Sequence, residues 1–171
     1  MNEPAVSTPD LRTADEFARF YRANLPAVYG YLLRLCGDDR ATAEDLTQET
    51  WMALAKEVQR GNHDCADIRW LFTVARSRFL DNARRQQRLT RKLALVHTSD
   101  DHVAHPEASV VLAGLAGLQP VHRLVLMLRY VEDLPVPTVA ATIGRNLTAT
   151  NSLLARARAE LRAHHQERPH D

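Results

Sequence analysis

The chain has 171 residues, of which 45% are hydrophobic, so it is long enough for one ordinary domain or two small ones. Its net charge of +1 divides into −3 for residues 1–60 and +2 for each of residues 61–107 and 108–171, which indicates surfaces of opposite sign. With only two cysteines, the fold does not depend on a disulfide framework. The sequence has no apolar run of membrane-spanning length and no signal-peptide pattern, so we expect a cytoplasmic protein without membrane insertion.

The first helix is predicted to begin near Ala14. Residues 1–13 hold two prolines and are expected to form a flexible leader. Apolar residues then recur at helical spacing, with Thr13 or Asp15 as the N-cap. Pro26 is expected to bend this helix or split it in two, and Gly37 to end it.

The next predicted helix, residues 41–59, has two distinct faces. An apolar face is suited to the core. A second face, here called the acidic stripe, consists of Asp45, Gln48, Glu49, Met52 and Lys56. A charged stripe alone is usually a solvated face, but Met52 in its centre favours a docking surface.

Residues 66–95 are predicted to form a strongly basic helix. It carries eight basic residues against two acidic ones. Ile68, Leu71, Phe72, Ala75, Phe79 and Ala83 share one face, and the opposite side carries Arg69, Thr73, Arg76, Arg84, Gln87 and Arg91. We therefore expect one side to face the core and the other to face phosphate.

The C-terminal half is predicted to hold shorter helices. Residues 96–107 mix polar residues and proline as a linker does. Helices are expected over residues 110–118, 120–132 and 137–143, and from residue 147 or 148 to 164, with Gly144 in the turn of a helix-turn-helix whose crossing uses Ala140 and Ala141. No segment alternates like a strand, so the expected fold class is all-α.

No metal, cofactor or catalytic site is predicted. The eight histidines form no zinc-binding spacing with the two cysteines, and a reduced, unreactive thiol is expected at Cys65. There is no Gly-rich phosphate loop, nucleophile elbow or convergent carboxylate pair. We therefore do not expect an enzyme.

Three runs agree in order and spacing with one family. They are residues 43–51 (AEDLTQETW), 70–85 (WLFTVARSRFLDNARR) and 152–161 (SLLARARAEL). Together they resemble the extracytoplasmic-function (ECF, group IV) sigma factors of bacterial RNA polymerase, members of the sigma-70 family. The resemblance implies a flexible leader at 1–13, sigma region 2 at 14–95, a flexible linker at 96–107, region 4 at 108–165 and a tail at 166–171.

The resemblance also implies partners and site residues. The partners are promoter DNA and core RNA polymerase, which is bound through the β′ clamp helices and the β flap. The family also implies regulation by an anti-sigma factor. Core binding is carried over to Asp45, Gln48, Glu49 and Met52. Binding of the −10 element is carried over to Asn62, His63, Asp64, Arg69, Trp70, Arg76, Asn82, Arg84 and Arg85.

The predicted −35 site departs from the family pattern. Its candidates are Arg145, Thr148, Asn151, Ser152, Arg156 and Arg158. Recognition helices in this family are usually more basic at their start, whereas here no charge precedes Arg156. Leu153 stands where an arginine is common, and it either contacts a thymine methyl group or belongs to the core.

Some residues and the protein class itself leave alternatives open. Trp70 is either a DNA contact or a core tryptophan. Arg78 and Arg85 fall off the main basic stripe, and one of them is expected to serve solubility or an intramolecular pair. The alternative function is a stand-alone helix-turn-helix regulator that binds duplex DNA, which leaves the acidic stripe and basic helix without a role. A protein that only binds an acidic partner does not account for the helix-turn-helix.

Overall fold

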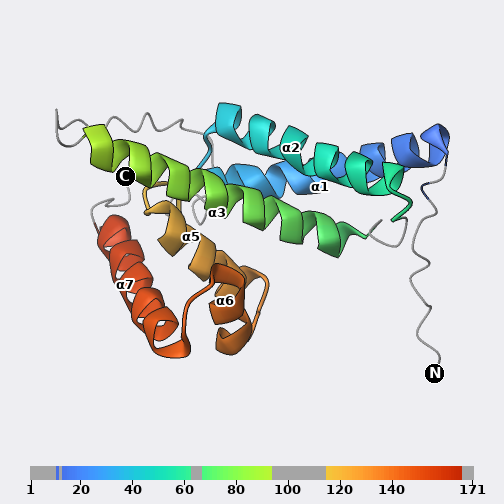
Figure 1. Cartoon of the computed structure of the whole chain (residues 1–171). Helices are drawn as coiled ribbons and strands as arrows, with labels where there is room; N and C mark the ends of the chain where they lie inside the picture. The colour runs from blue at the N-terminus through green and yellow to red at the C-terminus, as the bar shows by residue number, and fades with distance from the viewer. Residues whose placement is uncertain (1–10, 12, 63–66, 94–114, 167–171) are drawn as a thin grey trace, which may run out of the picture.

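The computed structural model describes residues 11, 13–62, 67–93 and 115–166, and every regular element among them is helical, as predicted. Three long helices lie side by side, and a second group of helices packs beneath them (Figure 1). The long helices are α1 (Ala14–Cys36), α2 (Arg40–Gln59) and α3 (Ile68–Leu93). The second group comprises α5 (Pro120–Leu126), the π-helix η2 (Met127–Val131), α6 (Val136–Ile143) and α7 (Leu147–Gln166). Within the described residues, no helix combines the length and apolarity needed to cross a membrane.

Helix α1 begins at the predicted cap and runs without a break. The Thr13 hydroxyl accepts from the Glu16 backbone N–H at 3.2 Å, and the Glu16 carboxylate accepts from the Thr13 N–H at 2.9 Å, so the two close a capping box. Of the two outcomes predicted for Pro26, a bend or a split, the split does not occur, because α1 continues to Cys36. Proline removes one backbone donor, and the burial of Val28 and Leu32 just beyond it holds the helix together.

The turn between α1 and α2 follows the predicted stop. Gly37 has φ 68°, the left-handed conformation that favours glycine at the end of a helix. Asp39 then caps α2, accepting from the Thr42 N–H at 3.2 Å. At the other end of α1, the rings of Phe17, Phe20 and Tyr21 pack edge-on around Trp51 of α2. These contacts fix α2 against α1.

Helices α6 and α7 form the predicted helix-turn-helix. Gly144 ends α6 with φ 67°, and Asn146 caps α7 by accepting from the Ala149 N–H at 2.8 Å. Ala140 is buried in the crossing, whereas Ala141 is exposed, so only one of the two predicted small residues permits close packing. The unit is held by buried Val139, Ile143 and Leu154.

A buried arginine joins the two groups of helices. Arg123 of α5 is 1% exposed and donates to four backbone carbonyls. Three of these belong to the segment just before α5: Leu115 at 2.7 Å, Ala116 at 2.7 Å and Leu118 at 2.9 Å. The fourth is Leu35 near the end of α1, at 2.5 Å. The guanidinium therefore binds backbone carbonyls on both sides of the junction.

We predict that Gly37→Ala destabilises the protein more than Gly144→Ala. Both glycines have positive φ, so each substitution brings backbone strain of about 1–2 kcal/mol. A Cβ at Gly37 would also lie 2.5 Å from Arg123 Nη2, whereas one at Gly144 meets nothing within 4 Å. The clash should add about 1–3 kcal/mol at Gly37 alone. Urea unfolding of both variants measures the difference, and equal losses of free energy would contradict the role given to Arg123.

Candidate nucleic-acid and protein-binding surfaces

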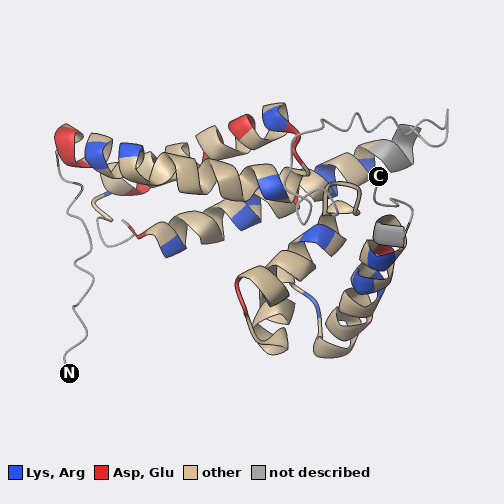
Figure 2. Cartoon of the chain, turned by 180° about the vertical axis from the view of Figure 1, so that it is seen from behind, with Lys and Arg blue, Asp and Glu red and all other residues tan. Residues whose placement is uncertain are grey.

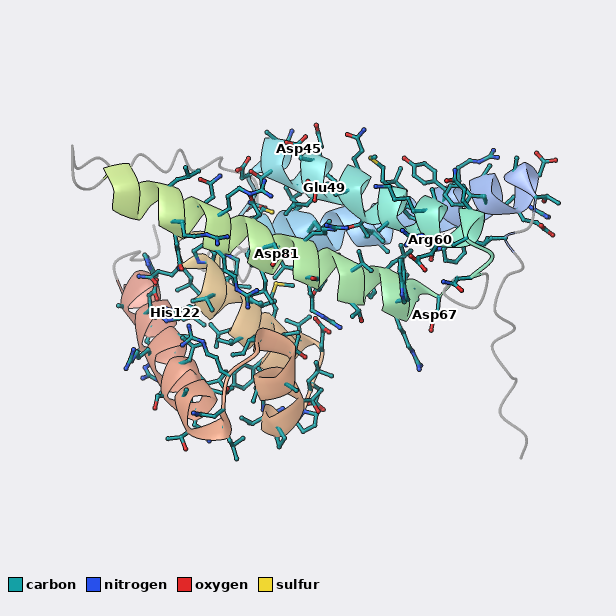
Figure 3. The ribbon with its side chains drawn as sticks, viewed as in Figure 1. Asp45, Glu49, Arg60, Asp67, Asp81 and His122 are labelled. Carbon is teal, nitrogen blue, oxygen red and sulfur yellow. The ribbon has the colours of Figure 1, made fainter. Side chains whose placement is uncertain are left out.

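The acidic stripe lies exposed along α2. All five of its residues are exposed, and Met52 keeps 51% of its surface accessible. Figure 3 places Asp45 and Glu49 along α2, beside α3. Glu49 approaches Arg78 of α3 with an Oε2 to Nε distance of 4.0 Å, and both side chains are about half exposed. Arg78 therefore makes the kind of intramolecular pair considered for it, one that is weak in water.

An apolar groove of about 720 Å³ adjoins the acidic stripe. Its α1 wall is formed by Phe17, Tyr21, Leu25, Pro26 and Tyr29, and its α2 wall includes Gln48, Trp51 and Met52. Gln48 and Met52 belong to both the groove and the stripe. The stripe is thus the charged border of a wider apolar surface that periodicity along α2 alone did not predict.

Helix α3 has the predicted core face. Leu71, Ala75 and Phe79 are buried, and Ile68, Phe72 and Ala83 are partly buried. Arg69, Arg84 and Arg85 are exposed, so their charges are available to phosphate. Figure 2 shows basic residues recurring along this helix.

Two candidates for base contacts on α3 lie at the edge of the core. Trp70 is partly buried and packs against core residues, and Asn82 is also partly buried.

Arg84 lies one turn beyond Asp81 and pairs with it at 3.4 Å, with both side chains more than half exposed. That pair leaves Arg84 accessible to a partner.

Arg76 does not face solvent as its position on the basic side predicts. Its side chain is only 14% exposed, and Nη1 lies 2.5 Å from Oε2 of Glu132, at the end of η2. Its Nη2 donates to Thr73 Oγ1 at 3.1 Å, and its buried Nε has no partner among the described residues. An acid from the second group of helices therefore covers this candidate.

The loop before α3 is described only in part. Asn62 is exposed, and its side-chain amide donates to Glu57 at 2.6 Å. This bond and one from Arg60 lower the pKa of Glu57. His63 and Asp64, also predicted to bind the −10 element, lie outside the described residues, as does Cys65.

The candidates for −35 binding are all exposed: Arg145, Thr148, Asn151, Ser152, Arg156 and Arg158. Four of these residues follow one another at intervals that share one face of α7, namely Thr148, Asn151, Ser152 and Arg156. Leu153 is only 6% exposed, which settles the alternative left open for it in favour of the core. The first turns of α7 carry no charge, and its basic residues follow in the C-terminal half (Figure 2).

Neither a metal cluster nor a reactive thiol is found in the described part of the chain. No three His, Cys, Asp or Glu side chains converge there. Burial raises the pKa of Cys36 to about 12, with a smaller contribution from Asp39, so this thiol stays protonated near neutral pH.

These surfaces define a two-part, all-helical protein with a helix-turn-helix. Sigma-70 region 2 matches residues 20–89, and sigma-70 region 4 matches residues 110–161. Both matches fall within the domain ranges expected from the sequence, whose limits stay a prediction.

The full chain is similar to several curated proteins. The ECF RNA polymerase sigma factor SigM of Bacillus subtilis is 30% identical, over 88% of this chain and 94% of SigM. BldN of Streptomyces coelicolor, another ECF sigma factor, is 31% identical over 84% of this chain. The chain spans 58% of BldN and 64% of SigE from Mycolicibacterium smegmatis, a further ECF sigma factor.

A solved structure shares the fold. The sigma factor RpoE of Bartonella quintana, crystallised with the anti-sigma factor NepR, aligns with a TM-score of 0.59 and 22% identity. The alignment covers 90% of this chain and 98% of RpoE. With both regions matched, the chain belongs to the sigma-70 family of RNA polymerase sigma factors, in the ECF group.

We predict that Leu153→Arg destabilises the protein and that Ser152→Arg does not. Leu153 is buried, so an arginine there has to bury its charge or disrupt α7, at a cost of about 3 kcal/mol. Ser152 is exposed, and its substitution should change stability by less than about 0.5 kcal/mol. Thermal unfolding compares the two. A Leu153→Arg variant as stable as wild type would contradict the assignment of this position to the core.

Proposed function

We propose that this protein is a sigma factor that binds core RNA polymerase, recognises the −10 and −35 promoter elements and directs the initiation of transcription. One observation carries the proposal. A single chain presents an exposed acidic stripe beside an apolar groove, a basic helix, and a helix-turn-helix with an exposed polar face. A stand-alone helix-turn-helix regulator needs only the last of these.

Core polymerase is proposed to dock on the acidic stripe. Asp45 and Glu49 offer negative charge, while Gln48 and Met52 extend into the groove. A basic, partly apolar helical surface such as that of the β′ clamp complements this combination, since charge orients the encounter and apolar burial supplies affinity. Region 4 is proposed to contact the β flap.

The basic helix α3 is proposed to hold the melted −10 strand. Exposed Arg69, Arg84 and Arg85 suit phosphates, and Trp70 and Asn82 offer an aromatic ring and an amide to unstacked bases. Arg76 and the loop residues Asn62, His63 and Asp64 complete the proposed site.

The exposed face of α7 is proposed to read the −35 duplex. Thr148, Asn151 and Ser152 supply donors and acceptors for base edges. The exposed Arg145, Arg156 and Arg158 are proposed to contact phosphates. Such contacts would position the helix but carry no sequence information.

The family supports three further proposals. The protein is proposed to act in the cytoplasm, where transcription takes place. It is proposed to be a regulatory subunit and not an enzyme. It is also proposed to be held by an anti-sigma factor, since the similar RpoE was crystallised with one.

We predict that Asp45→Arg combined with Glu49→Arg abolishes binding to core polymerase while the fold is retained. Both side chains are exposed, so the charge reversal changes the surface and leaves the core intact. Pull-down of core enzyme and run-off transcription measure the effect, with Asp15→Arg as a control at an exposed acid of α1. Retained core binding would refute the docking assignment. Tight, sequence-specific duplex binding by the wild-type chain without polymerase would favour the stand-alone regulator.

We predict that Asn82→Ala impairs promoter opening without affecting core binding. The amide is lost from a position at the edge of the core, beside the exposed arginines of α3. Permanganate reactivity of −10 thymines in the polymerase–promoter complex should fall by about tenfold, the effect of losing roughly 1.4 kcal/mol of contact. Gln86→Ala, at an exposed position one turn further along α3, is the control. Equal reactivity for Asn82→Ala and wild type would remove Asn82 from the site.

A further inference from the structure

Glu132 connects region 4 to two helices of region 2. It follows η2, and its two carboxylate oxygens bind different partners. Oε1 accepts from the Tyr31 hydroxyl of α1 at 2.8 Å, and Oε2 accepts from Arg76 Nη1 of α3 at 2.5 Å. Only 23% of the Glu132 side chain and 14% of the Arg76 side chain are exposed. The contact is therefore sheltered from water and from salt.

The surroundings of Glu132 favour this geometry. The Tyr31 ring packs against Phe72 of α3 with 4.9 Å between centroids, which fixes the hydroxyl. Burial, followed by the negative charge of Glu132, raises the pKa of Tyr31, so it remains a donor at every physiological pH. On the other side of the junction, Arg123 binds the Leu35 carbonyl. Two polar contacts thus add to the apolar packing that holds region 4 against α1 and α3.

This arrangement conflicts with promoter reading. The −10 and −35 elements are centred about 25 base pairs apart, or about 85 Å at 3.4 Å per base pair. Region 4 touches α3 here, so the two DNA-binding helices cannot reach both elements at once. The 21 residues from 94 to 114 can span about 70 Å when extended. The chain is therefore long enough to let the two regions separate.

We propose that Glu132 is an autoinhibitory latch, which closes region 4 onto region 2 in the free protein and covers Arg76 until core polymerase separates the two regions. The consequence for transcription rests on the proposed function, but the latch itself is a property of the free chain. The latch is polar, so its opening exposes groups that water solvates. A glutamate that binds two donors is also easily disabled by one substitution.

Glu132→Gln tests the latch in the full-length chain. It removes the charge and leaves Arg76 uncompensated in a sheltered site, which should shift the ratio of open to closed molecules by about tenfold or more. Small-angle X-ray scattering should show a larger radius of gyration. A fluorescent oligo-dT of about twelve nucleotides, a probe that needs no knowledge of the promoter, should bind about tenfold more tightly because Arg76 becomes available.

Three further variants guard against misfolding and general charge effects. Tyr31→Phe removes one hydrogen bond without a change in charge and should open the chain in the same direction, to a smaller extent. Asp133→Asn removes the neighbouring acid, whose side chain is 93% exposed, and should change neither measurement. The double variant with Arg76→Glu and Glu132→Arg exchanges the two charges. It should have a smaller radius of gyration than Glu132→Gln, close to that of wild type.

The outcomes separate the latch from the proposed function. An unchanged radius and oligo-dT affinity in Glu132→Gln would overturn the latch, as would equal effects of Asp133→Asn. If Glu132→Gln opens the free chain but wild type fails to bind core polymerase, the latch stands and the proposed function fails. If wild type binds core polymerase and directs transcription but Glu132→Gln opens nothing, the function stands without the latch.

Discussion

The buried guanidinium of Arg123 determines how region 4 sits on region 2. Burial lowers the pKa of Arg123, because moving a charged group out of water costs free energy. Four carbonyls offset that cost, and one of them belongs to α1. The same guanidinium occupies the space beside Gly37, so the turn after α1 accepts no side chain. The Arg123 guanidinium therefore contacts the end of α1, the turn that follows it and the junction between the two regions.

The two regions are each stabilised by their own apolar contacts. In region 2 the aromatic cluster around Trp51 joins α1 to α2, and in region 4 the crossing of α6 and α7 is closed by small and branched residues. One continuous cluster of buried apolar residues also runs through both regions, with α5 packed against α1 and α3. The contacts of Arg123 and Glu132 add directional hydrogen bonds to this apolar packing and fix how the two regions are oriented.

Local patterns in the sequence predicted most of the helices and the exposed candidates. Caps and stops were found correctly because Thr13, Gly37 and Gly144 act within their own turns. The continuous helix at Pro26 and the burial of Leu153 depend on packing from elsewhere, which a pattern within one helix does not report. The covering of Arg76 was missed for the same reason, since its partner Glu132 is 56 residues away. The apolar groove lies between α1 and α2, so the pattern of either helix alone gives half of it.

The π-helical turn at Met127–Val131 sets the direction in which the Glu132 side chain points at the junction. Its last bond runs from the Glu132 N–H to the Met127 carbonyl at 3.0 Å, one residue further than in an α-helix. Each residue of a helix turns the chain by about 100°. Deleting one residue here would let a regular helix form and would rotate the Glu132 carboxylate away from both Tyr31 and Arg76. A change in chain length, with no change of residue type, could thus set how firmly relatives of this protein hold their two regions together.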